Sequence, residues 1–270
     1  MVNTGQVEIT DSEFKEFRSF LYNETGIELS DKKRTLVMTR LAKRLRAYKF
    51  NTFSQYFDLI FGHDLKEKQQ AIDLLTTNET YFFREPEHFK FLTDTIIGEW
   101  NSPRSFRAWS AASSTGEEAY SIGMILADKL ANKPWEIQGT DISHTVLNAA
   151  SNGHYQMNRI DGIPPSYLKR FCLKGRDEFE GSLLVDSKIR QKVRFYSMNL
   201  TKPLPETGLF DVIFLRNVMI YFDAKTKEQV VRQLIERIRP GGYFLIGHSE
   251  SLKGMNVTLK LIKPTIYQKL

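Results

Sequence analysis

Residues 105–143 read SFRAWSAASSTGEEAYSIGMILADKLANKPWEIQGTDIS, and this stretch decides the fold. Residues 106–109 indicate a short buried strand, which a loop of small residues follows. From Glu117 onward the apolar residues have helical spacing, and the run 135–139 predicts a second strand that leads into Asp141. Strand, turn, helix, strand and terminal acid form a βαβ nucleotide-binding half, in which the acid binds ribose hydroxyls.

The turn between strand and helix indicates which nucleotide is bound. A dinucleotide site needs G-x-G-x-x-G so that backbone can approach a pyrophosphate, but only Gly116 is present here. Glu117 and Glu118 open the helix where a phosphate would bind, and they would repel it. S-adenosylmethionine (SAM) has ribose and adenine but no phosphate, and its cationic sulfonium and amino groups are favoured by acids. The alternative, that the two acids only complement the helix N-terminus, stays open on these residues alone.

Several motifs in order add a family resemblance. These motifs are TNETYFFR at 77–84, STGEE at 114–118, TDIS at 140–143, FDVIFLRNVMIYF at 210–222 and GHSE at 247–250. Together they resemble the CheR-type chemotaxis methyltransferases, SAM-dependent enzymes that methylate glutamate side chains of chemoreceptors. The resemblance covers almost the whole chain. It implies an α/β fold: a doubly wound, mostly parallel, Rossmann-like sheet with a small N-terminal all-helical domain and a β flap insertion.

The chain is predicted to have two domains. Capping signals at Thr10, Thr52 and Asp64 indicate a helical bundle. With the resemblance, residues 1–80 are expected to form a receptor-contacting helical domain and hinge. Residues 81–270 are expected to form the SAM-binding methyltransferase domain, with a β subdomain at about 160–195. Within this domain we expect a helix that extends to Tyr155, an amphipathic helix over 225–239, and a terminal β-hairpin of residues 259–262 and 266–270. In some relatives this flap docks a receptor peptide through a glycine-rich loop. This chain lacks a close pair of glycines there, so a purely structural flap is an equal alternative.

A predicted helix over residues 31–48 carries four cations outside its apolar arc, with no acid among them: Arg40, Lys43, Arg44 and Arg46. Alternating signs are common on a face that is merely solvated, so this pattern favours partner binding over a solvated basic face. The resemblance implies that this helix meets the acidic, Glu-rich methylation helices of a receptor. Such steering is salt-dependent.

The resemblance also implies roles for site residues. The cofactor contacts it gives are Asn78, Thr80, Arg84, Glu118, Asp141, Asn199 and Leu200, and the position of Arg216 and Asn217 in the sequence adds those two. The resemblance also places Arg84 near the reacting carboxylate, where a planar guanidinium can fix both oxygens. Its charge would be unfavourable against the sulfonium, so its role is placed at the methionine carboxylate of SAM or at the substrate acid. Arg216 and Asn217 follow a buried strand, and ligands of open α/β sheets bind beyond the carboxyl ends of strands. Tyr221 is interpreted as positioning the acceptor, with simple packing as the alternative.

The predicted reaction is direct displacement. A glutamate oxygen attacks the sulfonium methyl group and gives a glutamyl methyl ester and S-adenosylhomocysteine (SAH). A glutamate carboxylate is already ionised near pH 7, so His248 is not needed as a base. No Cys/His cluster in the sequence offers a metal site, and none is expected. Arg84 and Tyr221 are therefore the predicted catalytic residues, and their task is alignment.

Composition limits the partners and the compartment. The 270 residues carry a formal net charge of +6, which favours an acidic partner: nucleic acid, an anionic membrane surface or an acidic protein. R-N-V-M-I-Y stands where amino-methylating DNA enzymes carry N/D-P-P-Y, so no nucleic acid is expected, although a nucleic-acid methyltransferase and a non-catalytic SAM-binding regulator remain alternatives. The single cysteine, Cys172, indicates a reducing cytoplasm, and no apolar run reaches membrane-spanning length. We expect a cytoplasmic monomer that does not insert into membranes.

Overall fold

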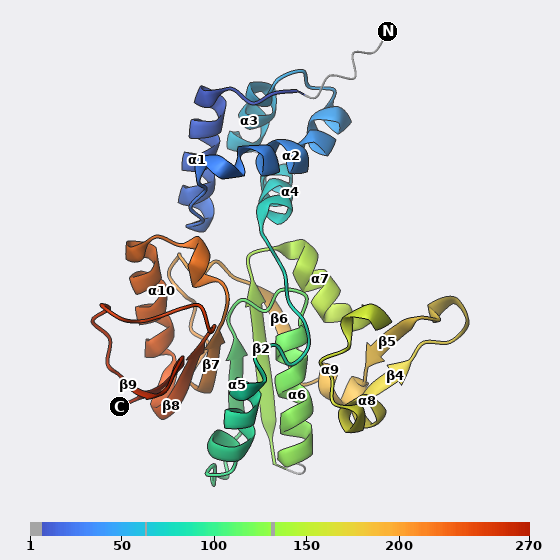
Figure 1. Cartoon of the computed structure of the whole chain (residues 1–270), viewed down its shortest axis with the longest axis vertical. Coiled ribbons are helices and arrows are strands. Elements are labelled where there is room, and N and C mark those ends of the chain that lie inside the picture. The colour runs from blue at the N-terminus through green and yellow to red at the C-terminus, as the bar shows by residue number, and fades with distance from the viewer. Residues whose placement is uncertain (1–6, 63, 131–132) are drawn as a thin grey trace. The chain divides into compact units, whose positions relative to one another are not determined.

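The computed structural model describes residues 7–62, 64–130 and 133–270, which form two compact units (Figure 1). The helical unit comprises the residues up to 77 together with 221–226. The sheet unit comprises residues 78–220 and 227–270. No helix in these described ranges is long and apolar enough to cross a membrane.

The helical unit is a small bundle. Its helices are α1 (Asp11–Thr25), the 3₁₀ turn η1 (Asp31–Lys33), α2 (Arg34–Tyr48), α3 (Phe53–Phe61) and α4 (Leu65–Leu75). The predicted caps are confirmed, because the Thr10, Thr52 and Asp64 side chains each accept a hydrogen bond from the backbone N–H three residues later. Aromatic rings fill the core, with those of Phe17 and Phe57 stacked at 4.9 Å between centroids.

The main sheet of the sheet unit has seven strands in the order β6-β2-β1-β7-β8-β10-β9. Five of them are parallel and the terminal hairpin is antiparallel. The strands are β1 (Phe106–Ser110), β2 (Trp135–Asp141), β6 (Val193–Ser197), β7 (Phe210–Leu215), β8 (Ile238–Ile246), β9 (Leu259–Lys263) and β10 (Ile266–Lys269). All six residues of the central strand β7 are buried, as a parallel strand covered on both faces requires.

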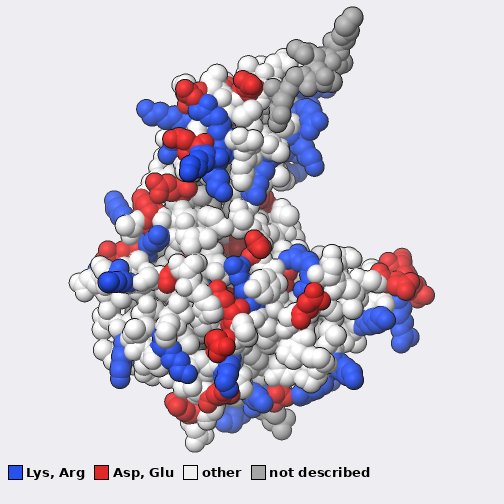
Figure 2. Space-filling view, viewed as in Figure 1, with Lys and Arg blue, Asp and Glu red and all other residues white. Residues whose placement is uncertain are grey.

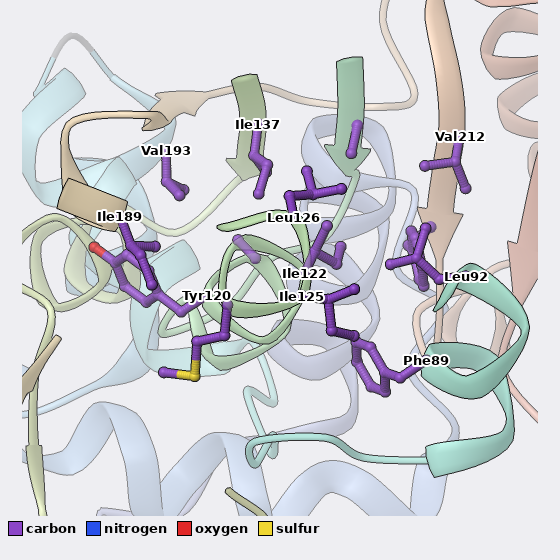
Figure 3. Close-up of a cluster of buried hydrophobic side chains, with 14 of the residues drawn as sticks. Phe89, Leu92, Tyr120, Ile122, Ile125, Leu126, Ile137, Ile189, Val193 and Val212 are labelled. Atoms are coloured by element: carbon purple, nitrogen blue, oxygen red, sulfur yellow. The ribbon is translucent and has the colours of Figure 1, made fainter. Parts of the chain in front are cut away.

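Helices cover the sheet because its strands are apolar on both faces. These helices are α5 (Pro86–Phe91), the π-helical η2 (Leu92–Ile97), α6 (Glu117–Lys129), α7 (His144–Asn152) and α10 (Ala224–Glu236). Figure 3 shows how α6 contributes Ile122, Ile125 and Leu126 to a cluster that also holds Ile137 of β2 and Val212 of β7. The predicted βαβ half and its doubly wound, mostly parallel context are thus confirmed.

A second, three-stranded antiparallel sheet follows α7, in the order β3-β5-β4. We call residues 154–185 the β flap. It contains β3 (His154–Gln156), η3 (Met157–Arg159), α8 (Pro165–Phe171), β4 (Cys172–Lys174), η4 (Asp177–Phe179) and β5 (Ser182–Val185). The short helix α9 (Ser187–Arg190) leads back to β6, which belongs to the main sheet.

Two predicted helix ends are wrong. The helix expected to reach Tyr155 ends at Asn152, because Gly153 takes a left-handed conformation and the chain turns into β3. The helix expected over 225–239 ends at Glu236, and β8 already begins at Ile238. Pro240 disfavours helix in the residue before it, and the ladder of β8 with β7 is interrupted between Ile238 and Tyr243. The helix expected over 31–48 starts as the 3₁₀ turn η1, and the α-helix itself begins at Arg34. The terminal hairpin is confirmed.

Candidate active site

The parallel strands end at one edge of the main sheet, and most of the predicted residues follow those ends. Asp141 closes β2, Asn199 lies two residues beyond β6, and Arg216 comes directly after β7. The register pairs Asp141 with Ser197 across β2 and β6. Ligands of such sheets bind beyond the carboxyl ends, so the topology itself assembles a candidate site at this edge.

The segment 78–85, which we call the edge segment, is tied along this edge by its backbone. The carbonyl of Asn78 accepts a hydrogen bond from Ser114 Oγ at 3.0 Å, and the Thr80 carbonyl accepts one from Arg159 Nη2 at 3.2 Å. The N–H of Phe83 donates to Ser121 Oγ at 3.0 Å. These bonds bring the three predicted residues of the segment, Asn78, Thr80 and Arg84, to the sheet edge.

Backbone strain gathers at this edge. Seven described residues other than glycine have a positive φ, and four of them are Phe83, Glu85, Ser114 and Asn217. A left-handed conformation costs a non-glycine residue about 1–2 kcal/mol and persists only where surrounding contacts enforce it. The concentration of such residues here marks the edge as a site whose geometry the fold maintains against local preference.

Asp141 is held as a ribose-binding acid should be. Its Oδ2 accepts the N–H of Ser114 at 2.9 Å, and its Oδ1 accepts the N–H of Ser143 at 3.0 Å. These backbone bonds, one to each oxygen, fix the plane of the carboxylate. A carboxylate held in this way at the end of β2 suits a pair of hydroxyl groups.

Arg216 is the most heavily contacted cation of the edge, and its side chain is 2% exposed. Its Nη1 lies 3.0 Å from Glu118 Oε2, and its Nη2 lies 3.0 Å from Glu85 Oε2. Its Nη2 also donates to the carbonyl of Arg84, and the ring of Phe89 lies 5.5 Å from the guanidinium carbon. Arg216 thus links β7, α6 and the edge segment.

Glu118 lies in the first turn of α6 and faces this guanidinium. Its Oε1 accepts from Ser110 Oγ at 2.7 Å. Burial raises the pKa of Glu118, and Arg216 and Ser110 oppose that rise. Its neighbour Glu117 is fully buried and pairs instead with Arg159 at 2.7 Å. The structure therefore separates the two acids, of which Glu118 alone joins the Arg216 cluster.

Glu85 was not anticipated, although it directly follows Arg84 in the recognised motif. Its Oε1 accepts from Asn217 Nδ2 and from the N–H of His248, each at 3.2 Å. Burial raises the pKa of Glu85, but Arg216, His248 N–H and Asn217 outweigh burial and bring it below its ordinary value. The residue has φ 59° and stands directly before Pro86.

Glu250, in the GHSE motif, is a second acid that the sequence did not single out. Its Oε2 accepts the N–H groups of Gly247 at 2.7 Å and Asn217 at 3.0 Å, and its Oε1 accepts that of Met219 at 2.8 Å. Burial raises the pKa of Glu250, and these N–H groups oppose the rise. The carboxylate joins the loop after β8 to the loop after β7, and so orders Arg216 and Asn217.

Arg84 differs from Arg216 in having no acidic partner within the described ranges. Its Nη1 donates to the Glu79 carbonyl at 2.8 Å, and its guanidinium carbon lies 5.6 Å from the ring of Tyr81, which is about half exposed. The guanidinium is held in place yet keeps donors for a carboxylate.

The remaining predicted positions behave differently. Asn199 turns its Oδ1 onto the N–H and hydroxyl of Thr201, at 2.9 and 2.7 Å, and Leu200 beside it is buried. Tyr221 belongs to the helical unit, where its carbonyl accepts the Glu28 N–H at 2.9 Å. Its proposed role at the acceptor stays a prediction.

Of the four α2 cations that were predicted to bind the receptor, two are engaged inside the helical unit. Arg44 forms a two-pronged pair with the buried Glu67, at 2.8 and 2.5 Å. Arg40 donates to the carbonyls of Leu74 and Thr76, at the C-terminal end of α4. Sequence periodicity could not foresee these partners, because they lie on another helix. Lys43 and Arg46 are exposed.

A group of possible metal ligands adjoins the site: Glu85, His88 and His248, whose ligand atoms lie within 4.8 Å of one another. Glu85 Oε2 is 3.0 Å from the Arg216 guanidinium, which would repel a divalent cation. His88 is buried with a pKa lowered to about 4, by burial first and then by Arg216, and its Nε2 lies 2.8 Å from Thr265 Oγ1. The donor set is better explained as part of the Arg216 cluster than as a metal centre.

Comparisons with known proteins agree with this picture. The family model of the CheR methyltransferase all-alpha domain matches residues 12–76, and that of the CheR methyltransferase SAM binding domain matches residues 78–268. The chain is 37% identical to a chemotaxis protein methyltransferase of Escherichia coli, over 98% of this chain and 93% of the relative. It is 38% identical to chemotaxis protein methyltransferase 2 of Pseudomonas aeruginosa, over 96% and 93%. A third relative, from Borreliella burgdorferi, is 37% identical over 99% of this chain and all of its own length.

Proposed function

The chain belongs to the CheR methyltransferase family and is a SAM-dependent methyltransferase, and from this premise we propose that it methylates glutamate side chains of chemoreceptor cytoplasmic helices. The product would be a glutamyl methyl ester in sensory adaptation. The observation that carries the substrate class is Arg84, whose guanidinium is held by the Glu79 carbonyl and has no acidic partner in the described part of the chain, and whose backbone carbonyl accepts from Arg216.

The residues of the edge fit SAM by their chemistry. The amino-acid end of SAM is a zwitterion, and Glu118 beside Arg216 offers one charge for each of its groups. Asp141 would hold the ribose hydroxyls, and Glu117 with Glu118 exclude a phosphate-bearing ligand. Asn78, Thr80, Asn199, Leu200 and Asn217 complete the proposed cofactor contacts.

When bound, SAM supplies an electrophilic methyl group on a cationic sulfur. The proposed task of Arg84 is to hold both oxygens of the acceptor glutamate through its planar fork, and Tyr221 is proposed to orient the same side chain. The acceptor is ionised near pH 7, so the chain needs no general base. The residues therefore act by orientation and by exclusion of water.

Receptor recognition is proposed for α2. Lys43 and Arg46 would contact acidic receptor helices directly, while Arg44 and Arg40 shape the surface through their partners in α4. On the face shown in Figure 2, basic and acidic side chains are intermixed over both units. Activity is expected to fall with ionic strength, because exposed charges are screened within about 8 Å at physiological salt. A cytoplasmic monomer remains our prediction, which light scattering and cell fractionation would test.

The test is base-labile methyl transfer. The protein is incubated with radiolabelled SAM and membranes that contain the receptors of its own host, and base is then added. Volatile labelled methanol is expected. Arg84→Ala should lower the turnover number about 10²-fold and change the calorimetric dissociation constant for SAM less than about threefold, because a two-pronged charged contact is lost only at the acceptor.

Arg194→Ala, at an exposed position of β6, is the matched control and should leave both quantities unchanged. Equal losses of turnover and SAM binding in Arg84→Ala would reject the acceptor role. Labelled nucleic acid in place of methanol would establish the nucleic-acid alternative, and SAM binding without any transfer would favour a regulator.

A further inference from the structure

The donors of Arg216 are nearly all in use. A guanidinium has five N–H donors. Nε and Nη2 lie 3.3 and 3.0 Å from Glu85 Oε2. Nη2 also donates to the Arg84 carbonyl, and Nη1 donates to Glu118. One donor, on Nη1, is left for a ligand. The orientation of that donor depends on Glu85, which accepts from the opposite side of the fork.

The contacts of Glu85 join the edge segment to the loops that follow β7 and β8. Besides Arg216 it accepts from Asn217 after β7 and from the His248 N–H after β8, and its own backbone continues Arg84. It keeps a left-handed conformation that its residue type disfavours. A position that is strained and this fully engaged is one whose side chain the site requires.

Two acids flank Arg216, Glu85 and Glu118, and each has a carboxylate oxygen 3.0 Å from the guanidinium. If Glu85 were neutral, the net charge of this cluster would rise by one unit in a site that is proposed to bind a cationic cofactor. In a partly buried site such a charge acts with an effective dielectric constant of about 20, far below that of water.

On the basis of the proposed function, we propose that Glu85 is a specificity-determining residue that shifts the relative affinity of the site towards the cationic methyl donor and away from the neutral product. It does so by orienting Arg216 and Asn217 and by offsetting the charge of Arg216. SAM and SAH share every group that the site could contact except the methyl group and the positive charge on sulfur. Loss of the Glu85 charge should therefore weaken SAM more than SAH and slow exchange of product for substrate.

The experiment compares the two ligands by calorimetry in wild type and in Glu85→Gln, which keeps the size of the side chain and removes its charge. The ratio of the SAH to the SAM dissociation constant should fall about five- to tenfold in Glu85→Gln, as one added charge in a medium-dielectric site requires. Glu87→Gln, an exposed acid two residues further on, is the matched control and should keep the ratio of the wild type.

Glu85→Asp keeps the charge and shortens the reach. It should keep the ratio within about twofold of wild type, even if it lowers both affinities and the melting temperature. This variant tests the proposal even where Glu85→Gln does not fold. Equal losses for SAM and SAH in Glu85→Gln, or a ratio that shifts as far in Glu85→Asp, would overturn it. Wild-type protein that binds neither ligand would instead refute the cofactor assignment on which the proposal rests.

Discussion

Glu250 gives the sharpest test of how the fold orders the site. In Glu250→Ala, the N–H groups of Gly247, Asn217 and Met219 lose the acceptor that they reach at 2.7, 3.0 and 2.8 Å. Each buried N–H left without a partner costs about 1–3 kcal/mol. The residue is 8% exposed, so water replaces only part of the loss. We expect about 3–6 kcal/mol of lost stability.

The matched variant is Glu250→Gln. Its amide oxygen can replace Oε2, which accepts two of the bonds, while its NH₂ faces the Met219 N–H. One bond of three is then lost, and the cost should be about 1–3 kcal/mol. The net value of the native carboxylate is smaller than the cost of removing it, because burial itself opposes the charge.

Thermal unfolding followed by circular dichroism measures both. At about 2–4 °C per kcal/mol for a unit of this size, Glu250→Ala should melt about 10–15 °C lower than wild type and Glu250→Gln about 5 °C lower. Glu236→Gln, exposed at the end of α10, should melt with the wild type. A melting temperature of Glu250→Ala within about 2 °C of wild type would refute the reasoning. So would a Glu250→Gln variant that melts as low as Glu250→Ala.

Two further predictions concern stability. The pKa of His88 is about 4 in the folded protein and 6.5 ordinarily, so only the unfolded chain takes up this proton between those values. The free energy of unfolding should fall by up to about 1.4 kcal/mol per pH unit as pH drops from 6.5 towards 4. Urea titrations at pH 7, 6 and 5 should show that His88→Gln lacks this part of the pH dependence. The same pH dependence in wild type and His88→Gln would contradict the buried neutral histidine. In the helical unit, Glu67→Gln leaves Arg44 without its carboxylate and weakens the bond from Tyr56 at 2.7 Å. This substitution should lower the free energy of unfolding by about 3–5 kcal/mol and so lower the urea midpoint. Methyl transfer measured at low temperature should be unchanged. An unchanged urea midpoint would show that the pair is not buried in solution.

The contrast between Arg44 and Arg84 shows where sequence reasoning ends. Both were assigned to binding by their pattern and by resemblance. Arg44 lies outside the apolar arc of its helix, yet α4 brings the buried Glu67 against it. Arg84 meets no acid in the described part of the chain. The difference depends on which residues a distant element brings close, and no local periodicity contains it.

The sequence by itself determined the βαβ half, the helical bundle with its caps, the terminal hairpin and the acid at the end of β2. These follow from periodicity, capping and breaker residues, which act over a few neighbours along the chain. Only the tertiary structure decided the use of Glu85 and Glu250. The partners of Glu85 lie 131–163 positions away in sequence. Those of Glu250 lie 31–33 positions away, or three for Gly247, and they converge because parallel strands end at one edge. The sequence shows only that a loop contains a glutamate. Whether its carboxylate is solvated or accepts three backbone N–H groups depends on the packed fold.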